Sequence, residues 1–376
     1  TLFLSGTGTV SNKNVSSNQS VTLGTLALSD TGATGDTANY SLNSAKLNIV
    51  QRPISTVYLT KLYDASTTVQ ASDLQTMSNL VGSETLTLTG NSTISDANVG
   101  TKTVNTGGFT LNDQAGANAS SGGLASNYIL SGGTHQLVIN QRPLNATLAR
   151  QYDGTTASAG STLSSFDALQ GGETLTMTGS GTAASANVAN GIAMSSNGNL
   201  ALADGTGAAS NYSLNSTVIN ISQRVLNSSG SKTYDGNTNA VASDVTLSNL
   251  AGGETLSHSG TATLGSKNVG SSTISNLAGI SIANGTGAAS NYTLTGGTHN
   301  FTVNKRVVNV SGTRLYNALN TAVASDLSTM TNLVGSETLV LSNSGTLANA
   351  NVGSNKTVTI GSLSLGNGSN GGLAAN

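Results

Sequence analysis

Residues 150–156 read Arg-Gln-Tyr-Asp-Gly-Thr-Thr (RQYDGTT), and three further heptads of the same kind occur in the chain. These are KLYDAST at 61–67, KTYDGNT at 232–238 and RLYNALN at 314–320. Each places a basic residue two positions before a tyrosine, and an Asp or Asn directly after that tyrosine. A motif that returns at the spacing of a small domain predicts tandem repeats of one fold.

The length of one repeat follows from a second motif, a Gln-Arg or Lys-Arg pair that opens each copy. Its arginines are Arg52, Arg142, Arg224 and Arg306, which lie 90, 82 and 82 residues apart. The chain of 376 residues therefore reads as three complete repeats between two partial ones. The predicted bounds are 1–50 (partial, the C-terminal part of a repeat), 51–140, 141–222, 223–304 and 305–376 (partial, lacking its last strands).

Three other motifs recur in a fixed order within the copies. A Gly-Gly or Gly-Ser pair followed by Glu-Thr-Leu contains every glutamate of the chain: Glu84, Glu173, Glu254 and Glu337. An Asn-Val pair and an Asn-Tyr pair follow. Asn376 occupies the place of Asn127, directly before a tyrosine, so we expect a longer polypeptide in which a tyrosine comes next and a glutamate precedes the first residue.

Almost all local patterns indicate β-strands. The stretch TLTLTG at 85–90 alternates polar and apolar residues with the period of a strand, and HQLVIN at 135–140 precedes a Gln-Arg pair with a similar alternation. The best helix candidates, 72–80 and 325–333, are long enough for one or two turns only. We predict an all-β chain of tandem small β-sandwich or β-grasp-like modules of about 82–90 residues.

The connection between modules predicts their mutual arrangement. The junction VINQRPLNATL at 138–148 contains neither a Gly/Ser run nor a proline-rich spacer. Because such a connection leaves little slack, we expect each module to hold a preferred orientation to the next, which gives an extended rod.

Composition excludes several classes of protein. Charged residues make up 8% of the chain, the formal net charge is −2, and there is no cysteine, so disulfides are impossible and no basic surface for nucleic acid is expected. No apolar run is long enough to span a membrane, and no signal peptide is visible. The polar surface consists mainly of Ser, Thr and Asn, which is typical of extracellular β structure.

The heptads could be catalytic corners or turns. A catalytic or metal-binding role would need a carboxylate in every copy, but Asn317 cannot act as a base. Ala65 and Ala318 replace the glycine in two copies, so we expect an Asx or type I turn without a positive φ at that position. We interpret the following residues as a structural repeat motif, with the tyrosines in the core: Tyr63, Asp64, Tyr152, Asp153, Gly154, Tyr234, Asp235, Gly236, Tyr316 and Asn317.

No other set of residues predicts chemistry. His135, His258 and His299 are too few and too scattered for a zinc site, and the aspartates do not form a calcium loop. No Ser-His-Asp set recurs with the repeat. We therefore predict no catalytic residues, no metal, no cofactor and no enzymatic activity, and we leave ligand-binding residues unassigned.

The ordered motifs K/R-x-Y-D-G-x-T, G-G-E-T-L, Asn-Val-Gly, Asn-Tyr-x-Leu and V-I-N-Q-R-P-L resemble the YDG and MBG-type repeats of large bacterial exoproteins. Such repeats are found notably in haemagglutinin-like adhesins exported by two-partner secretion. The resemblance covers essentially the whole chain. It implies a place at the bacterial cell surface or in a secreted or biofilm matrix, a role as stalk or adhesive repeats, and no enzymatic activity.

Two functional alternatives remain open beside a stalk. Carbohydrate binding by each module is one of them, since Tyr58 is an extra tyrosine in the junction strand that is one residue longer than its counterparts. A self-assembling extracellular filament is the other. The partners expected from these readings are neighbouring modules, other copies of the chain, or a surface or matrix polysaccharide.

Overall fold

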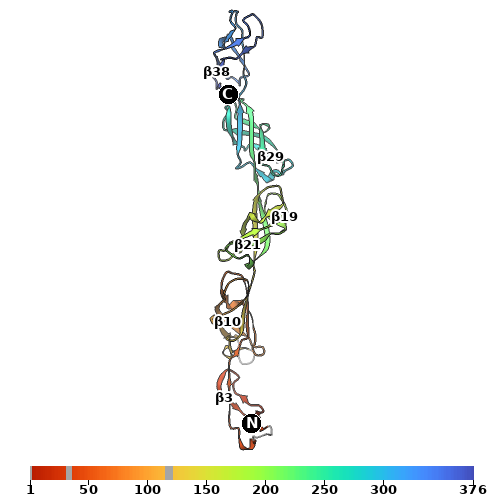
Figure 1. Ribbon diagram of the computed structural model, residues 1–376, viewed down its shortest axis with the longest axis vertical. Coiled ribbons are helices and arrows are strands. Elements are labelled where there is room, and N and C mark those ends of the chain that lie inside the picture. Colours follow the sequence, from red (N-terminus) through yellow and green to blue (C-terminus); the bar gives the residue numbers. More distant parts are fainter. Residues whose placement is uncertain (1, 31–35, 115–121) are drawn as a thin grey trace. The chain divides into compact units, whose positions relative to one another are not determined.

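The computed structural model describes residues 2–30, 36–114 and 122–376 and is shown in Figure 1. Within these ranges the chain consists of β-strands, turns and single turns of 3-10 helix, so the all-β prediction is confirmed. None of the described helices is long and apolar enough to cross a membrane. Packing divides the chain into two units: Thr1–Thr147 with Ala159–Ser180 and Asn197–Thr217, and Leu148–Ser158 with Gly181–Ser196 and Val218–Asn376.

The first unit starts with a partial repeat. Its elements are β1 (Leu2–Ser5), β2 (Thr9–Val10), β3 (Ser16–Thr22), β4 (Ala27–Asp30), the 3-10 helix η1 (Thr37–Asn39) and β5 (Ala45–Ile49). Strand β1 pairs with β4, and β3 pairs with β2 and β5, all of them antiparallel.

A complete repeat follows in the same unit. It contains β6 (Arg52–Pro53), β7 (Thr56–Leu62), β8 (Thr68–Gln70), η2 (Ala71–Asp73), β9 (Leu74–Met77), β10 (Leu86–Thr93), β11 (Gly100–Thr103), η3 (Thr106–Gly108), β12 (Phe109–Asp113), η4 (Ala125–Asn127), β13 (Tyr128–Ile129) and β14 (Thr134–Asn140). One sheet has the strand order β11-β14-β7-β9, and a second has the order β12-β10-β8. The first sheet holds β7 and β14 as a parallel pair at its centre.

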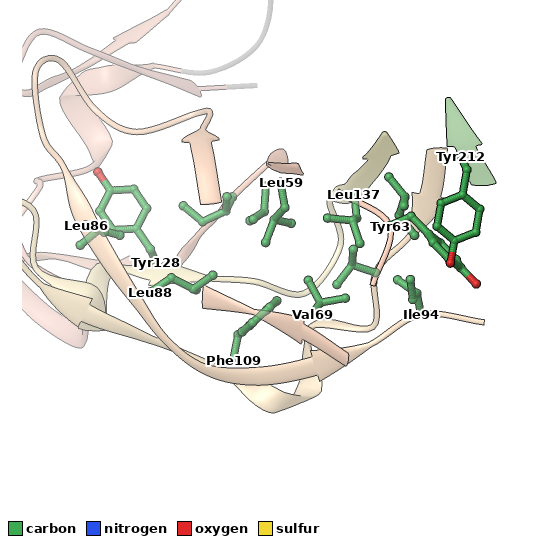
Figure 2. Close-up of a cluster of buried hydrophobic side chains, with 14 of the residues drawn as sticks. Leu59, Tyr63, Val69, Leu86, Leu88, Ile94, Phe109, Tyr128, Leu137 and Tyr212 are labelled. Atoms are coloured by element: carbon green, nitrogen blue, oxygen red, sulfur yellow. The ribbon is translucent and has the colours of Figure 1, made fainter. Parts of the chain in front are cut away.

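The core of this repeat lies between the two sheets (Figure 2). Leu59 on β7 and Leu137 on β14 are fully buried, and they pack in one cluster with Leu88 on β10 and Phe109 on β12. Along β10 the threonines that alternate with the leucines are exposed. The period-two pattern of 85–90 therefore does what the sequence predicts: it gives the strand one apolar and one solvated face.

The repeat 141–222 contributes residues to both units. Its elements are β15 (Arg142–Gln151), β16 (Ala157–Ala159), η5 (Gly160–Thr162), β17 (Leu163–Phe166), β18 (Leu175–Thr178), β19 (Ser180–Ala183), β20 (Ala189–Ser196), β21 (Ala201–Asp204), η6 (Ala209–Asn211) and β22 (Tyr212–Ser222). Within the first unit β18 pairs with β21, and within the second β20 pairs with β19 and β22.

The second unit contains the complete repeat 223–304, which repeats the architecture of 51–140. Its elements are β23 (Arg224–Val225), β24 (Asn227–Thr233), β25 (Asn239–Val241), η7 (Ala242–Asp244), β26 (Val245–Ser248), β27 (Leu256–Leu264), β28 (Gly270–Asn276), β29 (Ile280–Asn284), η8 (Ala289–Asn291), β30 (Tyr292–Thr293) and β31 (His299–Asn304). Strands β24 and β31 form the central parallel pair, flanked by β26 and β28.

The residues 305–376 form the last part of the second unit. Their elements are β32 (Asn309–Ser311), β33 (Thr321–Val323), η9 (Ala324–Asp326), β34 (Thr329–Thr331), β35 (Leu339–Ser342), β36 (Ser344–Leu347), β37 (Val358–Thr359) and β38 (Ser364–Asn367). Strand β32 pairs with β34, β35 with β38, and β36 with both β33 and β37.

The two helix candidates correspond to a single 3-10 turn followed by a strand. In the first, η2 ends at Asp73, whose carboxylate accepts a hydrogen bond from the Gln70 N–H at 2.9 Å. The next residues form β9, which pairs with β7. The prediction of one or two turns at most is therefore met by a single turn, and the remaining residues pair with a neighbouring strand because a two-turn helix would be only marginally stable.

Candidate functional site at the repeat junctions

A buried polar arrangement of the first unit lies where one repeat meets the next. The hydroxyl of Tyr63, from the heptad of repeat 51–140, donates a hydrogen bond of 2.5 Å to Oε1 of Glu173 in repeat 141–222. The other oxygen, Oε2, accepts a hydrogen bond of 2.5 Å from the hydroxyl of Tyr212. The two rings meet edge to face with centroids 5.2 Å apart. One carboxylate thus joins tyrosines from two successive repeats.

The second unit contains the same arrangement. Tyr152 and Tyr292 donate hydrogen bonds of 2.6 and 2.5 Å to the two carboxylate oxygens of Glu254, and their ring centroids lie 5.4 Å apart. We call each set of two tyrosines and one glutamate a junction cluster. These four tyrosines are 2–4% exposed, so the heptad tyrosines Tyr63 and Tyr152 lie in the interior as predicted.

Parts of the cluster occur at the two remaining junctions. Tyr128 donates to Glu84 in the first unit, and Tyr234 donates to Glu337 at 2.6 Å in the second. A cavity of about 140 Å³ lies beside that second pair. Tyr316, for which the sequence contains no later glutamate, is 64% exposed, so the prediction that it lies in the core is wrong. Burial of the heptad tyrosine therefore accompanies its contact with the glutamate of a following repeat.

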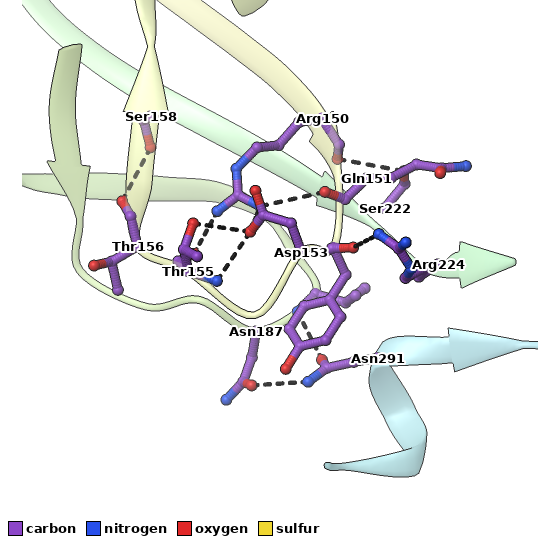
Figure 3. Close-up of polar contacts among 12 residues, drawn as sticks. Arg150, Gln151, Asp153, Thr155, Thr156, Ser158, Asn187, Ser222, Arg224 and Asn291 are labelled. Atoms are coloured by element: carbon purple, nitrogen blue, oxygen red, sulfur yellow. Dashed lines mark hydrogen bonds and ion pairs between the residues drawn. The ribbon is translucent and has the colours of Figure 1, made fainter. Parts of the chain in front are cut away.

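An asparagine pair lies beside each complete cluster. In the first unit, the Asn211 side chain accepts a hydrogen bond from the Val99 N–H and donates one to Asn98, both at 2.9 Å. In the second unit Asn291 makes the equivalent bonds to Val188 and Asn187, and Figure 3 shows the pair. Asn211 is 2% exposed, so these bonds satisfy a buried amide that belongs to one repeat with partners from the preceding repeat.

The recurrent arginine explains why a Gln-Arg or Lys-Arg pair opens each copy. Arg142 donates to the backbone oxygens of Tyr63 at 3.2 Å and Ala168 at 3.1 Å. Arg224 and Arg306 likewise donate to the backbone oxygens of Tyr152 and Tyr234. The guanidinium therefore connects the heptad of one repeat to the loop of the next.

Burial in the cluster changes the proton affinity of the tyrosines. Burial, and next the hydrogen bond to Glu254, raise the pKa of Tyr292 to about 12. The same two causes raise the pKa of Tyr63 and Tyr212 beside Glu173 and of Tyr152 beside Glu254. The neutral hydroxyl is favoured because its deprotonation would place a second negative charge against the carboxylate.

A comparison with known protein families matches the YDG domain at residues 50–135, 140–219, 221–300 and 302–376. The chain belongs to the YDG domain family. No curated protein and no solved structure matches the chain.

The heptad of each YDG repeat forms an Asx turn. The side chain of the acid or amide accepts a hydrogen bond from the backbone N–H two residues later, at 2.9–3.1 Å, in Asp64, Asp153, Asp235 and Asn317. Figure 3 shows Asp153 accepting from Thr155 and pairing with Arg150. Because the turn needs only an acceptor, Asn serves as well as Asp.

The expectation that the position after the acid has no positive φ is wrong. Gly154 and Gly236 have φ values of 81° and 80°, and Ala65 and Ala318 have 59° and 62°. The residue after the acid or amide is therefore left-handed in all four heptads. The alanines are tolerated because αL costs a residue with a Cβ only about 1–2 kcal/mol, which the surrounding contacts can offset.

The basic residue of the heptad secures the same turn. Lys61 contacts Asp64 Oδ1 at 2.9 Å and donates to the backbone oxygens of Ser66 and Thr68 at 2.8 and 2.9 Å. Its side chain is 7% exposed, so the ammonium is held among acceptors. In the last copy, where Asn317 is uncharged, Arg314 pairs with Asp326 instead.

We expect glycine at position 65 to stabilise its repeat. Ala65→Gly removes the left-handed strain and should raise the free energy of unfolding by up to about 1 kcal/mol, whereas Gly154→Ala should lower it by a similar amount. The space beside Gly154 accepts a methyl group, since the nearest atom is 3.6 Å from an added Cβ, so the backbone alone decides that effect. Urea unfolding of the parent and of the two variants measures both changes. Changes in the free energy of unfolding that have the same sign in the two variants would contradict the prediction.

The histidines have structural positions. His135 is 5% exposed, accepts the Val57 N–H at its Nδ1 at 3.1 Å, and contacts the backbone oxygen of Leu130 through Nε2. His258 and His299 each contact backbone oxygens of their own repeat. Among the described residues, no group of three His, Cys, Asp or Glu side chains could hold a metal ion. Tyr58 is half-buried on β7.

Sequence reasoning missed the role of the glutamates and the amide of the Asn-Tyr motif. The signal was present, since each copy with the Glu-Thr-Leu segment contributes one glutamate and the chain has no others. A lone carboxylate that recurs once per repeat, in a chain of 8% charged residues, indicates a partner that also recurs once per repeat.

Proposed function

We propose that these YDG repeats are a structural stalk segment of a bacterial cell-surface or secreted adhesin or matrix fibre, which projects or links an adhesive element. The observation that carries the proposal is the junction cluster, built twice from the same residue types with nearly the same geometry. A cluster that serves only to join successive repeats is what a mechanical spacer needs, whereas an enzyme needs a reactive group open to substrate.

Three features support stiff coupling of neighbouring repeats. A single residue, Gln141, separates β14 from β15, so the connection has almost no slack. The core cluster of the first unit includes Leu144, Leu175 and Tyr212 beside residues of repeat 51–140. Figure 2 shows Tyr212 beside Tyr63. The buried polar contacts between repeats are directional. Apolar burial and fixed hydrogen bonds together oppose free hinge motion at a junction.

The amino-acid composition supports an extracellular localisation of the stalk. A surface of Ser, Thr and Asn with 8% charged residues and no cysteine suits a chain exported unfolded and kept outside the cell without disulfides. Adhesion itself needs a partner, for which we propose a surface or matrix polysaccharide or another copy of the chain. A polysaccharide pull-down with the full chain tests this part, and absence of binding would leave a spacer without adhesive activity of its own.

Small-angle X-ray scattering of the full chain tests the stalk. A compact particle of this length would have a radius of gyration of about 21 Å. Repeats joined end to end, each roughly one ten-residue strand long, should give about 40–45 Å. The double variant Glu173→Ala/Glu254→Ala should broaden the distribution of shapes, while Thr176→Ala, on an exposed strand face, should not. A compact parent particle would refute the stalk.

A further inference from the structure

The first and last long strands of each complete YDG repeat that lies within one unit are direct neighbours and run parallel. In repeat 51–140, β7 and β14 are paired over seven residues, from Thr56 opposite Thr134 to Leu62 opposite Asn140. In repeat 223–304, β24 and β31 are paired over six residues, from Ser228 opposite His299 to Thr233 opposite Asn304. The chain therefore enters and leaves a repeat through two adjacent strands.

This pairing determines how tension along the chain acts on a repeat. The chain enters at the N-terminal end of β7 and leaves at the C-terminal end of β14, and in a parallel pair these two points lie at opposite ends of the ladder. Tension then pulls the two strands past each other along their own axes. All hydrogen bonds between them are stretched together, whereas an antiparallel terminal pair would open one bond after another.

We propose that this parallel pair is a shear-resistant clamp and that each complete YDG repeat is built to bear tensile load between its ends. The biological use of the clamp rests on the proposed stalk function, but its resistance to shear follows from the strand pairing alone. The residues that define the clamp are 56–62 with 134–140, and 228–233 with 299–304.

Further backbone bonds lengthen the clamp at both ends. Before β7 the Ile54 N–H donates to the oxygen of Ile129 at 2.8 Å, and after β7 the Tyr63 N–H donates to the oxygen of Asn140 at 2.9 Å. Repeat 223–304 has both bonds, from Leu226 to Thr293 and from Tyr234 to Asn304. The last bonded residue is the heptad tyrosine, whose hydroxyl and backbone oxygen bind the next repeat, so load passes from clamp to junction without an intervening loop.

The clamp is also shielded from water. It occupies the centre of its sheet, with β9 paired to the outer edge of β7 and β11 to that of β14. On the inner face Val57, Leu59, Leu137 and Ile139 are at most 1% exposed. Water that could replace a strained backbone bond is therefore excluded from that face and from the paired parts of the edges, residues 57–59 of β7 and 136–139 of β14, which slows forced unfolding.

Single-molecule force spectroscopy can compare two directions of pulling on the same fold. The chain contains no cysteine, so two introduced cysteines give unique attachment points in the full-length protein. Ser55→Cys with Asn140→Cys loads β7 and β14 in shear. Ser55→Cys with Ser131→Cys pulls on the two N-terminal ends, which lie together, and peels the pair apart. All three positions are exposed.

We expect the shear direction to require a severalfold higher unfolding force than the peel direction, because roughly seven bonded positions break together instead of singly. Each direction should release about 250–280 Å of chain, which identifies unfolding of repeat 51–140. Equal unfolding forces in the two directions, measured at the same loading rate, would refute the proposed clamp. The scattering experiment tests the stalk independently of the clamp. A compact particle that resists shear would refute the stalk function but support the clamp. An elongated particle with equal forces in the two directions would support the stalk but refute the clamp.

Discussion

Replacing Glu173 by alanine should lower the free energy needed to open the junction of the first unit by about 3 kcal/mol. The carboxylate accepts hydrogen bonds from the hydroxyls of Tyr63 and Tyr212, which are 3% and 2% exposed. Hydrogen bonds to a charged group contribute about 1.5–3 kcal/mol each, and the truncation leaves two buried hydroxyls without their acceptor. The Tyr212 hydroxyl still accepts a hydrogen bond from the Gln170 N–H, but its own proton has lost its acceptor.

Amide hydrogen exchange measures this effect locally, which matters because a chain of several repeats need not unfold in one step. The amides of Val99 and Gln170 report on the junction, since the first bonds Asn211 and the second bonds Tyr212. Both should exchange faster in Glu173→Ala. Unchanged protection at both amides would show that the carboxylate contributes nothing to the junction.

A triple variant separates hydrogen bonding from packing. Tyr63→Phe/Glu173→Leu/Tyr212→Phe removes both donors and the acceptor while keeping the rings and much of the volume. Exchanging a buried polar set for apolar groups of similar shape is often nearly neutral, so this variant should regain most of the stability that Glu173→Ala loses. Thr176→Ala serves as a control because its side chain is exposed on β18.

The sequence contains enough information for the strands and the repeat but not for the contacts between repeats. Leu86 and Leu88 alternate with threonines, and a strand places alternate residues on opposite faces whatever its neighbours are, so that part of the fold is local. The partner of Tyr63 lies 110 residues away in the next copy, and no local pattern specifies such a distance. Only the once-per-repeat recurrence of glutamate hinted at it.

One local prediction failed, and another was met at its lower limit. At most two helical turns were expected at 72–80, and the structure has the single turn η2, after which β9 pairs with β7, a strand that the sequence alone cannot place there. Ala65 suggested a turn without a left-handed residue, yet its φ is 59°. At Ala65 tertiary contacts overcome a preference of about 1–2 kcal/mol, which is small beside the burial of a repeat core.

Alkaline pH should destabilise the complete repeats, because it ionises the tyrosines of the junction clusters. Burial and the contact with Glu254 raise the pKa of Tyr292 to about 12, against about 10 in an unfolded chain. Below pH 10 both states hold the proton, and the stabilising contribution is fully present. Above it the unfolded state releases the proton first, so stability falls as the pH rises through the folded pKa, by up to about 1.4 kcal/mol per pH unit for each such tyrosine.

The ultraviolet absorbance of tyrosinate and the circular dichroism of the strands, followed together between about pH 9 and pH 13, test this linkage. Ionisation of the clustered tyrosines should coincide with loss of structure, because a second negative charge beside Glu254 is incompatible with the closed junction. Tyr292→Phe removes one of the ionising groups and should make the alkaline loss of stability shallower, while lowering stability at neutral pH through the lost hydrogen bond. An unchanged slope in this variant, or full ionisation of the folded chain near pH 10, would contradict the role assigned to the cluster.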